Sequence, residues 1–423
     1  MNQHSRCRIF SHFSNKNQAS YCCHDINRSK PPVSTLCPRR FVQVTNQHDS
    51  TTGFLCNHTQ FAKYRTNFIC PVHVHICSDK CLYRINGKIE NIVGMSIEAS
   101  GGRAAVGDIC QIYNGDAGGQ VMAEVVGFKN DHILLMPYSD MSGISAGNFV
   151  RNTGRRLSLR MGPFLKGRVI NALGQPIDGK GPFQGGTLFC VENNHYINPM
   201  TRPPIRERME FGVKAIDSML TIGKGQRIGY FCRLRRGQEY PNGHDCQKCK
   251  GGYQRHRPGG ERGREVLEFM EKDLGPEGMR RSILVVATSD QPAMLRKQCP
   301  SVATGIAEFF RDQGYDVLLM MDSLTRFAMA QREIGLAVGE PPVSRGYTPS
   351  IYAELPKLLE RSGNFQKGSI TGVYTVLVEG DDTNEPIADT VRGILDGHIV
   401  LSRRLANSNH FPAIDIGARH LPF

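Results

Sequence analysis

The sequence predicts an α/β fold, in which helices cover a largely parallel β-sheet, preceded by a small all-β barrel domain. Apolar runs and amphipathic helical patterns alternate between residues 265 and 322, which is typical of a parallel sheet with helices on both faces. Before them, between residues 90 and 138, short β-rich runs are separated by turns, as in a small antiparallel barrel or sandwich. With 423 residues the chain can hold two or three domains and a sizeable core.

Residues 84–160 are predicted to form the N-terminal barrel domain. The expected strands read IENIVGMSIEA, DICQIY, VMAEVVGF and HILLMPY, and the turns between them read GGRAAVG, NGDAGG and KNDH. The following stretch, Leu165–Gly179, is expected to form a strand and a Gly/Pro turn that enters the main domain. Residues 161–416 are assigned to this main domain.

The strands and helices of the main domain follow from its apolar pattern. Helices are expected over Glu265–Lys272 and Val302–Gln313, and fully buried strands over Ser282–Ser289 and Val317–Asp322. The second helix ends before Gly314 and has one apolar face, formed by Val302, Ile306, Phe309 and Phe310. In such sheets ligands bind beyond the carboxyl ends of the strands, so a functional site is expected at that edge.

Several long motifs give the chain a strong resemblance to a known family. They read GKGQRIG (Gly223–Gly229), GERGREV (Gly260–Val266), VLLMMDSLTRFAMAQREI (Val317–Ile334), GEPPVSRGYTPS (Gly339–Ser350), YTVLVEGDDTNEPIAD (Tyr374–Asp389) and ILDGHIVLSRRLA (Ile394–Ala406). Over Arg84–Gly229 and Gly260–Ile416 the chain resembles the flagellar protein-export ATPase. The type III secretion ATPases are close relatives, and the catalytic subunit of rotary ATP synthases is a more distant one. The resemblance implies a RecA-like P-loop NTPase core, and a barrel that helps to assemble a ring of subunits.

Residues 230–259 interrupt this resemblance. A nucleotide-driven member needs a Gly-rich phosphate loop, G-x-x-x-x-G-K-[ST], after the strand that GKGQRIG opens. The chain instead reads YFCRLRRGQEYPNGHDCQKCKGGYQRHRPG, in which we predict no strand, no loop of that spacing and no apolar helix. Gln238 replaces the loop lysine in register, and Glu239 or Tyr240 replaces the hydroxyl residue for Mg²⁺. The phosphate loop is thus absent from its expected positions, Arg233, Leu234, Arg235, Arg236, Gly237, Gln238, Glu239 and Tyr240.

The genetic code offers an explanation for this stretch. Cys232–Tyr240 can be encoded by tgc cgg ctc agg cgt ggg caa gag tac, which reads AGSGVGKST, a complete phosphate loop, when it starts one base later. The next codons can give LMGMIAKNAK, and the end of the stretch can give ADINVIGLV, a β-strand leading into GER. We infer an extra base near Phe231–Cys232 and a lost base near Gly259, a compensated pair of frame shifts. An authentic basic insertion is the alternative.

By resemblance, residues on both sides of the interruption have catalytic or binding roles. Asp322 would be the Walker B aspartate, which holds Mg²⁺ through water, or else the N-cap of the following helix. Glu261 would orient the attacking water, or else be an ordinary acid at a helix start. Arg262 is a catalytic candidate and Arg326 a nucleotide-binding candidate, and each could instead be an ion-pair partner.

Two further candidates and the end of the chain follow from the same resemblance. Phe411, in NHFPAID, would stack against adenine, or else be a core residue. Arg345, in PPVSRGYTPS, would face the central pore of the ring, or else be a solvated loop charge. Reading Arg419 as agg and removing one base turns the last residues into ASISR, the segment that supplies the family's arginine finger. Residues 417–423 are therefore interpreted as an out-of-frame tail, with the C-terminal helical domain missing.

Basic charge and cysteine gather in two segments. The net charge is +13, yet residues 1–83 hold ten basic and three acidic residues and residues 230–259 hold seven and two, so the remainder is nearly neutral. Of the 14 cysteines, eight lie in the first 81 residues and three in residues 230–259. This distribution argues against nucleic-acid binding, and we expect no disulfide framework. Residues 1–83 lack any sustained period and are interpreted as disordered or out of frame.

Two groups of cysteine and histidine suggest a different class of function. His244, Cys246, Cys249 and His256 contain a C-x-x-C spacing, and His73 and His75 lie close to Cys70, Cys77 and Cys81. Such groups can ligate zinc, so a non-catalytic zinc- or RNA-binding protein is an alternative. If the frame-shift interpretation is right, the first group results from translation in another register. The spacing of the second group matches no regular zinc pattern.

The intact ancestor is expected to be a homohexameric, Mg²⁺-dependent ATPase of flagellar export. By resemblance, it would release export substrates from chaperones and feed them to an export gate in the membrane, with a stator or regulator as a further partner. No apolar run reaches the length of a membrane span and no signal peptide is evident, so we expect a cytoplasmic protein. The resemblance further implies a position peripheral to the inner membrane, at the export apparatus. A virulence-type secretion ATPase and a catalytically dead scaffold are alternatives. As written, the chain is expected to fold poorly and neither to bind ATP well nor to hydrolyse it.

Overall fold

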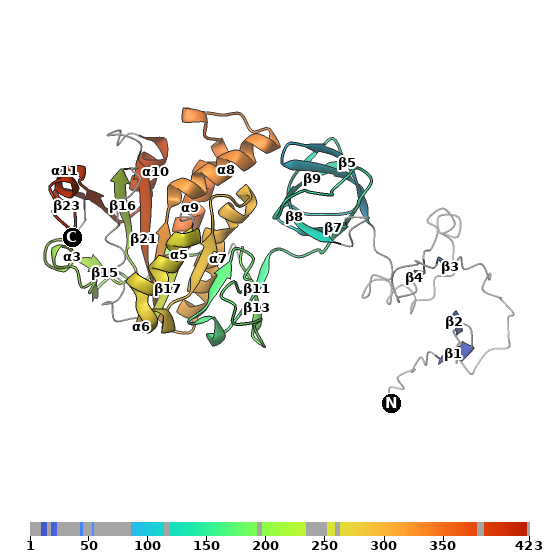
Figure 1. Cartoon of the computed structure of the whole chain (residues 1–423), viewed down its shortest axis with the longest axis horizontal. Coiled ribbons are helices and arrows are strands. Elements are labelled where there is room, and N and C mark those ends of the chain that lie inside the picture. The colour runs from blue at the N-terminus through green and yellow to red at the C-terminus, as the bar shows by residue number, and fades with distance from the viewer. Residues whose placement is uncertain are drawn as a thin grey trace. The chain divides into compact units, whose positions relative to one another are not determined.

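The computed structural model describes residues 10–14, 18–22, 43–44, 53–54, 86–113, 119–192, 197–233, 252–258, 263–378 and 385–420. The chain divides into two units, Met1–Arg84 and Ile85–Phe423 (Figure 1). In the first unit, β1 (Phe10–Ser14) pairs with β2 (Gln18–Cys22) and β3 (Gln43–Val44) pairs with β4 (Gly53–Phe54). Most of residues 1–83 lies outside the described ranges, so their interpretation as disordered or out of frame stays a prediction.

The second unit begins with a closed barrel, which confirms the barrel and excludes the sandwich. Around the barrel the strands follow the order β10-β5-β6-β9-β8-β7, all antiparallel. Inward-facing apolar residues alternate with outward ones along the strands, and Ile97, Val125 and Leu135 are fully buried in its centre. The strands are β5 (Gly87–Val93), β6 (Ser96–Ser100), β7 (Ile109–Tyr113), β8 (Gln120–Lys129), β9 (His132–Pro137) and β10 (Phe149–Asn152).

The main sheet is parallel over most of its width, as predicted. Its order is β12-β18-β17-β19-β21-β16-β22-β23, with β23 antiparallel at one edge and β20 pairing antiparallel with β21. The strands are β12 (Val169–Asn171), β16 (Arg227–Arg233), β17 (Gly252–Pro258), β18 (Leu284–Ala287), β19 (Asp316–Asp322), β20 (Gly363–Asn364), β21 (Ser369–Val378), β22 (Gly397–Leu401) and β23 (Ile414–His420). Two small pairs lie outside this sheet, β11 (Ser158–Met161) with β13 (Thr187–Cys190) and β14 (Arg208–Met209) with β15 (Ile222–Gly223).

Helices cover both faces of this sheet. Successive residues of a strand point to opposite faces, and Leu319 packs in the core beside α7, whereas its neighbour Leu318 packs in the core beside α3 and Phe269. The helices are α3 (Lys214–Met219), α5 (Gly263–Glu268), α6 (Gly275–Arg280), α7 (Ala293–Asp312), α8 (Leu324–Val338), α9 (Pro349–Leu359), α10 (Pro386–Ile394) and α11 (Arg403–Asn407), with a π-helical stretch at Phe269–Leu274 and 3-10 turns at Pro163–Leu165, Pro199–Thr201 and Ser344–Gly346. Both predicted layers of helices are therefore present.

The start of one helix differs from its prediction. α7 begins at Ala293, whereas the sequence pattern places its start at Val302. Pro300 lies inside the helix, where its missing N–H normally favours a boundary. Residues on both sides of this proline, Cys299 and Val302, are buried. The Thr304 hydroxyl donates to the Pro300 carbonyl at 2.8 Å. Packing therefore outweighs the local preference of Pro300.

The prediction that residues 230–259 contain no strand is wrong. β16 continues to Arg233, and β17 occupies Gly252–Pro258 in the middle of the sheet. β17 pairs in parallel with β18 on one side, as in Arg255 with Leu284, and with β19 on the other, as in Tyr253 with Leu318. Backbone N–H and C=O groups pair whatever side chain they carry. The two neighbouring strands therefore impose an extended conformation that the residues of this segment do not favour.

Candidate functional site

The carboxyl edge of the main sheet gathers the segments in which the site residues were predicted. β16 ends at Arg233 next to Val378 of β21, and Asp322 ends β19 next to Thr375 of the same strand. β17 ends at Pro258, and β22 ends at Leu401 before the loop that contains Phe411. Because these strands are parallel, the segments that follow them leave the sheet at one edge. The topology therefore brings the ends of β16, β17 and β19 to one edge of the sheet, with Asp322 at the end of β19.

Asp322 lies at the junction of β19 and α8 and is half-buried. The N-cap of α8 is Ser323, whose Oγ accepts the backbone N–H of Arg326 at 3.4 Å. The alternative role predicted for Asp322, as the N-cap of this helix, thus belongs to Ser323. A carboxylate at this position can serve a hydrated Mg²⁺ ion.

Thr325 fixes the position of this junction, and sequence reasoning missed it. Its side chain is buried, its Oγ1 donates to the Leu377 carbonyl at 3.1 Å, and the Leu377 N–H donates back to Oγ1 at 2.9 Å. One hydroxyl therefore ties the first turn of α8 to the carboxyl end of β21. A hydroxyl residue in the first turn of a helix that directly follows an apolar strand was the available signal.

Two of the predicted catalytic residues lie outside the described residues. Glu261 and Arg262 fall in the interval between the end of β17 at Pro258 and the start of α5 at Gly263. The expected phosphate-loop positions begin at Arg233, the last residue of β16, and continue through Leu234, Arg235, Arg236, Gly237, Gln238, Glu239 and Tyr240, which are not described. The roles of these residues therefore stay predictions.

The predicted nucleotide-binding residues lie on two different elements. Phe411 lies in the loop between α11 and β23, and 60% of its surface is exposed. The ring is therefore accessible for stacking and does not belong to the core, which was the alternative. Arg326 lies in the first turn of α8 and is half-buried. Its proximity to Asp322 in the chain places it at the same edge of the sheet.

The loop that contains Arg345 is anchored at its C-terminal end by a hydrogen bond and by packing. Glu340 Oε2 accepts the Ser350 backbone N–H at 3.2 Å at the start of α9. Thr348 packs against Gly335 of α8 so closely that a Cβ on Gly335 would lie 2.6 Å from the Thr348 hydroxyl oxygen. Arg345 itself has a left-handed backbone, with φ of 51°. The role of Arg345 in a central pore stays a prediction.

The residues at this edge fit only part of a Mg²⁺–ATP site. A hydrated Mg²⁺ ion suits Asp322, and an exposed ring such as Phe411 suits adenine. A phosphate cradle needs successive backbone N–H groups in a Gly-rich turn and a lysine on the β/γ-phosphates. Residues 233–240 hold a single glycine, Gly237, and no lysine. Residues 233–240 therefore do not supply the donors that would bind the phosphates of a nucleotide.

Most residues of the two groups proposed for zinc, His244 among them, lie outside the described part of the chain. Cys246 and Cys249 and the whole N-terminal group lie outside it, and of His256 only the backbone is described. Among the described residues, no group of three or more His, Cys, Asp or Glu side chains is arranged to hold a metal ion. Within the same residues, no helix combines the length and the apolar character needed to cross a membrane.

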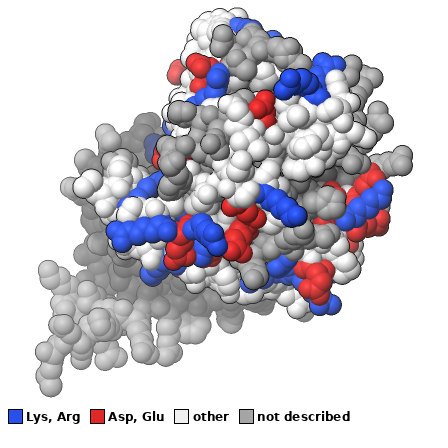
Figure 2. All heavy atoms as spheres, turned by 90° about the vertical axis from the view of Figure 1, so that its left-hand side faces the viewer, with Lys and Arg blue, Asp and Glu red and all other residues white. Residues whose placement is uncertain are grey.

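Charged side chains of both signs share the surface of the second unit. On the face shown in Figure 2, blue and red side chains are interspersed, and no continuous basic patch is visible among the described residues. Many of the described charges are paired, as in Lys224 with Glu207 at 2.7 Å and Lys129 with Glu98 at 3.0 Å. The described charges on this face are therefore mixed in sign.

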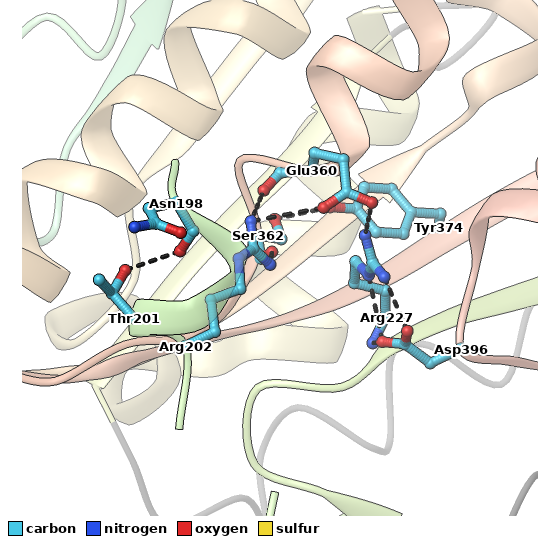
Figure 3. Close-up of polar contacts among 8 residues, drawn as sticks. All are labelled: Asn198, Thr201, Arg202, Arg227, Glu360, Ser362, Tyr374 and Asp396. Carbon is cyan, nitrogen blue, oxygen red and sulfur yellow. Dashed lines mark hydrogen bonds and ion pairs between the residues drawn. The ribbon is translucent and has the colours of Figure 1, made fainter. Parts of the chain in front are cut away.

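At the amino edge of the same sheet, a dense polar network joins the starts of β16 and β22 (Figure 3). The Arg227 guanidinium donates to both oxygens of Asp396, at 3.1 and 2.7 Å, and to Glu360 at 2.6 Å. Burial lowers the pKa of Arg227, but hydrogen bonds and charge from Asp396 and Glu360 outweigh it and raise the pKa overall. Arg202 donates to the Ser362 carbonyl at 3.0 Å.

Tyr374 completes this network from the centre of the sheet. It is fully buried, and its hydroxyl donates to Ser362 Oγ at 2.7 Å (Figure 3). Burial raises the pKa of Tyr374 to about 12, so the phenol stays neutral. Each of these side chains has its partner within the fold, which indicates a structural role for the amino edge.

Comparisons with known proteins agree with this architecture. The model of the ATP synthase alpha/beta family, nucleotide-binding domain, matches residues 212–419, and the model of that family's beta-barrel domain matches residues 89–154. The flagellum-specific ATP synthase of Bacillus subtilis (strain 168) is 54% identical over 335 residues, which cover 79% of this chain and 76% of the relative. The type 3 secretion system ATPase of Xanthomonas euvesicatoria is 46% identical over 330 residues, covering 78% and 74%.

Solved structures extend the likeness to three dimensions. The assembled ATPase EscN of the enteropathogenic E. coli type III secretion system is 43% identical, with a TM-score of 0.74 over 79% of this chain and 80% of that chain. EscN in complex with its central stalk EscO is 42% identical, with a TM-score of 0.72 over 80% of each chain. The chain therefore belongs to the ATP synthase alpha/beta family and, within it, to the flagellum-specific ATP synthases and type III secretion system ATPases.

Proposed function

We propose that this chain is a version of the ATPase of the flagellar protein-export apparatus whose phosphate-binding segment has been overwritten. The observation that carries the proposal is the contrast between 54% identity to a flagellum-specific ATP synthase and the missing phosphate-loop motif in residues 230–259. The carboxyl edge supports it, because Asp322 ends β19 and Phe411 is exposed, while residues 233–240 lack the glycines and the lysine of a phosphate loop. The intact protein would couple ATP hydrolysis to release of export substrates from chaperones.

The composition of β17 supports translation in a shifted register. This strand has a buried parallel neighbour on each side, and α7 packs against it, yet it reads GYQRHRP with two arginines and a histidine. Charged residues in a sheet covered on both faces cost several kcal/mol unless they are paired. The shifted reading ADINVIGLV supplies β-branched apolar residues at the same positions. One change of reading frame thus gives both an apolar sequence for the central strand β17 and the phosphate loop.

Partners and location follow from the family. We infer a homohexamer, with a stator or regulator, chaperones and export-gate proteins as partners, at the cytoplasmic side of the inner membrane. The assembled EscN structures, one of them with the central stalk EscO, support an oligomer and a regulator. A virulence-type secretion ATPase is the second candidate, because type 3 secretion system ATPases match this chain at 46% identity.

The test compares the chain as written with a chain in which residues 232–259 carry the shifted reading. The chain as written should show no saturable MgATP binding and no Mg²⁺-dependent phosphate release, because the phosphate donors are absent. The re-phased chain should bind MgATP, and alanine in place of its loop lysine at position 238 should abolish this binding again. Mg²⁺-dependent ATPase activity of the chain as written would contradict the proposal. So would a folded, re-phased chain that fails to bind MgATP.

Sequencing the gene across both junctions addresses the frame shifts directly. The proposal requires codons for residues 232–259 that encode a phosphate loop one base later. Codons that cannot be re-phased in this way would identify the segment as an authentic insertion. The loss of the phosphate cradle would then need another explanation.

A further inference from the structure

A buried ion pair joins the barrel to the α/β domain. Glu124 of β8 and Lys297 of α7 lie 3.7 Å apart, with 6% and 18% of their side chains exposed. The second oxygen of Glu124 accepts a short hydrogen bond from the hydroxyl of Tyr138, which is fully buried. Tyr138 is itself fixed to the barrel, since its N–H donates to the Met122 carbonyl at 2.9 Å. The barrel therefore presents one positioned carboxylate to one cation of the α/β domain.

The contact around this pair is apolar and rich in methionine. Met136 of the barrel and Met294 of α7 belong to one apolar cluster, against which Met122 of the barrel packs. Near the end of β8 the two domains also approach closely, because a Cβ on Gly127 would lie 3.8 Å from Val338 of α8. Apolar contact is non-directional, and methionine adapts its shape to different neighbours. Such a contact favours docking of the barrel but specifies its orientation weakly.

A second buried ion pair lies on the same side of α7. Both oxygens of Glu308 accept hydrogen bonds from Arg361, which follows α9, at 2.9 and 2.6 Å, and both side chains are largely buried. Lys297 and Glu308 lie about three turns apart and within about 20° of each other around the helix axis. α7 thus offers a cation to the barrel and an anion to Arg361. A barrel displaced along this side of α7 would move Glu124 toward a carboxylate of the same charge.

The energetics of a buried ion pair separate specificity from stability. The loss of hydration on burying two charges can equal or exceed their attraction, so an apolar replacement of both is often neutral or stabilising. Removal of one partner alone is strongly destabilising, because the other charge stays buried without compensation. The Glu124–Lys297 pair therefore adds little to the affinity of the barrel for α7. A barrel docked in another orientation, however, would leave both charges buried and apart.

We propose that Glu124, Tyr138 and Lys297 form an orientation pin, which selects a single docked orientation of the barrel on α7. The apolar contact around the pin supplies the affinity, and the pin penalises every other orientation. It does not depend on nucleotide, and none of its residues belongs to residues 230–259. The pin therefore acts in the chain as written, whether or not the proposed function is right.

Distances between two spin labels test the pin in the full chain. Ketone-bearing residues in place of Val93 on the barrel and Leu267 on α5, both more than half exposed, carry the labels and leave the cysteines unmodified. Double electron–electron resonance should give one narrow distance distribution for the parent chain. The apolar variant combines Glu124→Leu, Tyr138→Phe and Lys297→Met. Its distribution should broaden or gain a second peak, displaced by about 5 Å if the barrel slips by one turn of α7.

Urea denaturation separates orientation from stability. Lys297→Met alone should lower the denaturation midpoint, because Glu124 stays buried without its cation, whereas the apolar variant should recover the parental midpoint. Charge reversal, Glu124→Lys with Lys297→Glu, should keep the single distance. An ion pair that only stabilises the contact would instead leave the distance distribution unchanged in every folded variant.

The matched control is Glu98→Gln with Lys129→Met, which removes a more exposed ion pair elsewhere on the barrel and should leave the distances unchanged. The same measurements on the re-phased chain guard against poor folding, because the pin residues are identical in both chains. A single narrow distance in the folded apolar variant would overturn the proposal, and so would a broad distribution in both parent chains. An apolar variant that does not fold would contradict it as well, since the pin would then be needed for stability.

Discussion

The two edges of the main sheet differ in the residues that they gather. At the amino edge, Arg227 contacts two carboxylates and Tyr374 contacts Ser362, so donors and acceptors meet within the fold. At the carboxyl edge, Asp322 and Phe411 are in place, but the residues after β16 lack the glycines and lysine of a phosphate loop. An edge whose polar side chains pair within the protein stabilises the fold. An edge that binds a ligand depends on a loop that the fold itself does not need. Under the proposed function, the scaffold therefore survives in sequence while the phosphate site does not.

Replacing residues 251–259 by ADINVIGLV should produce the largest effect. This change removes two arginines and a histidine from a strand with buried neighbours, and we expect the free energy of unfolding to rise by roughly 3–5 kcal/mol. Urea denaturation followed by circular dichroism measures the change. The control replaces two exposed arginines, Arg208 and Arg280, by valine and should give no gain. An equal or lower stability of the ADINVIGLV chain would show that β17 tolerates its charges.

Asp396→Asn should cause the largest loss at the amino edge. The change leaves the buried guanidinium of Arg227 without its two-oxygen partner, which typically costs about 3 kcal/mol. The matched control is Asp389→Asn, whose carboxylate is exposed and 3.7 Å from Arg392, and which should cost less than about 0.5 kcal/mol. Chemical denaturation of both variants gives the comparison. Similar losses of unfolding free energy for the two variants would mean that the Arg227–Asp396 ion pair contributes no more than an exposed one.

The sequence predicted a small antiparallel β domain followed by a parallel sheet, because apolar period and turn residues report directly on those elements. The choice of a barrel over a sandwich came from the family resemblance. It could not predict the start of α7, since Pro300 is tolerated only through packing from other parts of the chain. Thr325 was missed for a related reason, because its partner, the backbone of Leu377, is far away in sequence. Glu261 and Asp322 could be named only through family motifs. Spacing alone left Asp322 divided between metal binding and capping, until the structure assigned the cap to Ser323.

The amino edge should also lose stability in acid through Asp178. Arg168, which precedes β12, donates to Asp178 at 2.5 and 2.9 Å, and these hydrogen bonds lower the pKa of Asp178 from 3.8 to about 2. A lowered pKa gives a stabilisation of about 2 kcal/mol that is complete above pH 3.8 and is lost as the pH falls to about 2. Asp178→Asn should remove this acid-dependent loss. A parent and a variant with parallel stability curves between pH 5 and 2 would argue against the ion pair.

The most local effect should come from Thr325, which connects the comparison to the site itself. Thr325→Val keeps the shape but removes both hydrogen bonds to the Leu377 backbone, which leaves a buried N–H and C=O unpaired and should cost about 1–3 kcal/mol. Thr325→Ser keeps the hydroxyl and should recover most of this loss. Thr304→Val is the matched control, because the Thr304 hydroxyl only adds a bond to a carbonyl within its own helix. Chemical denaturation ranks the three variants. If Thr325→Val costs no more than Thr304→Val, the junction at Asp322 is held by packing, and the carboxyl edge lacks the hydrogen-bonded anchoring that the amino edge shows.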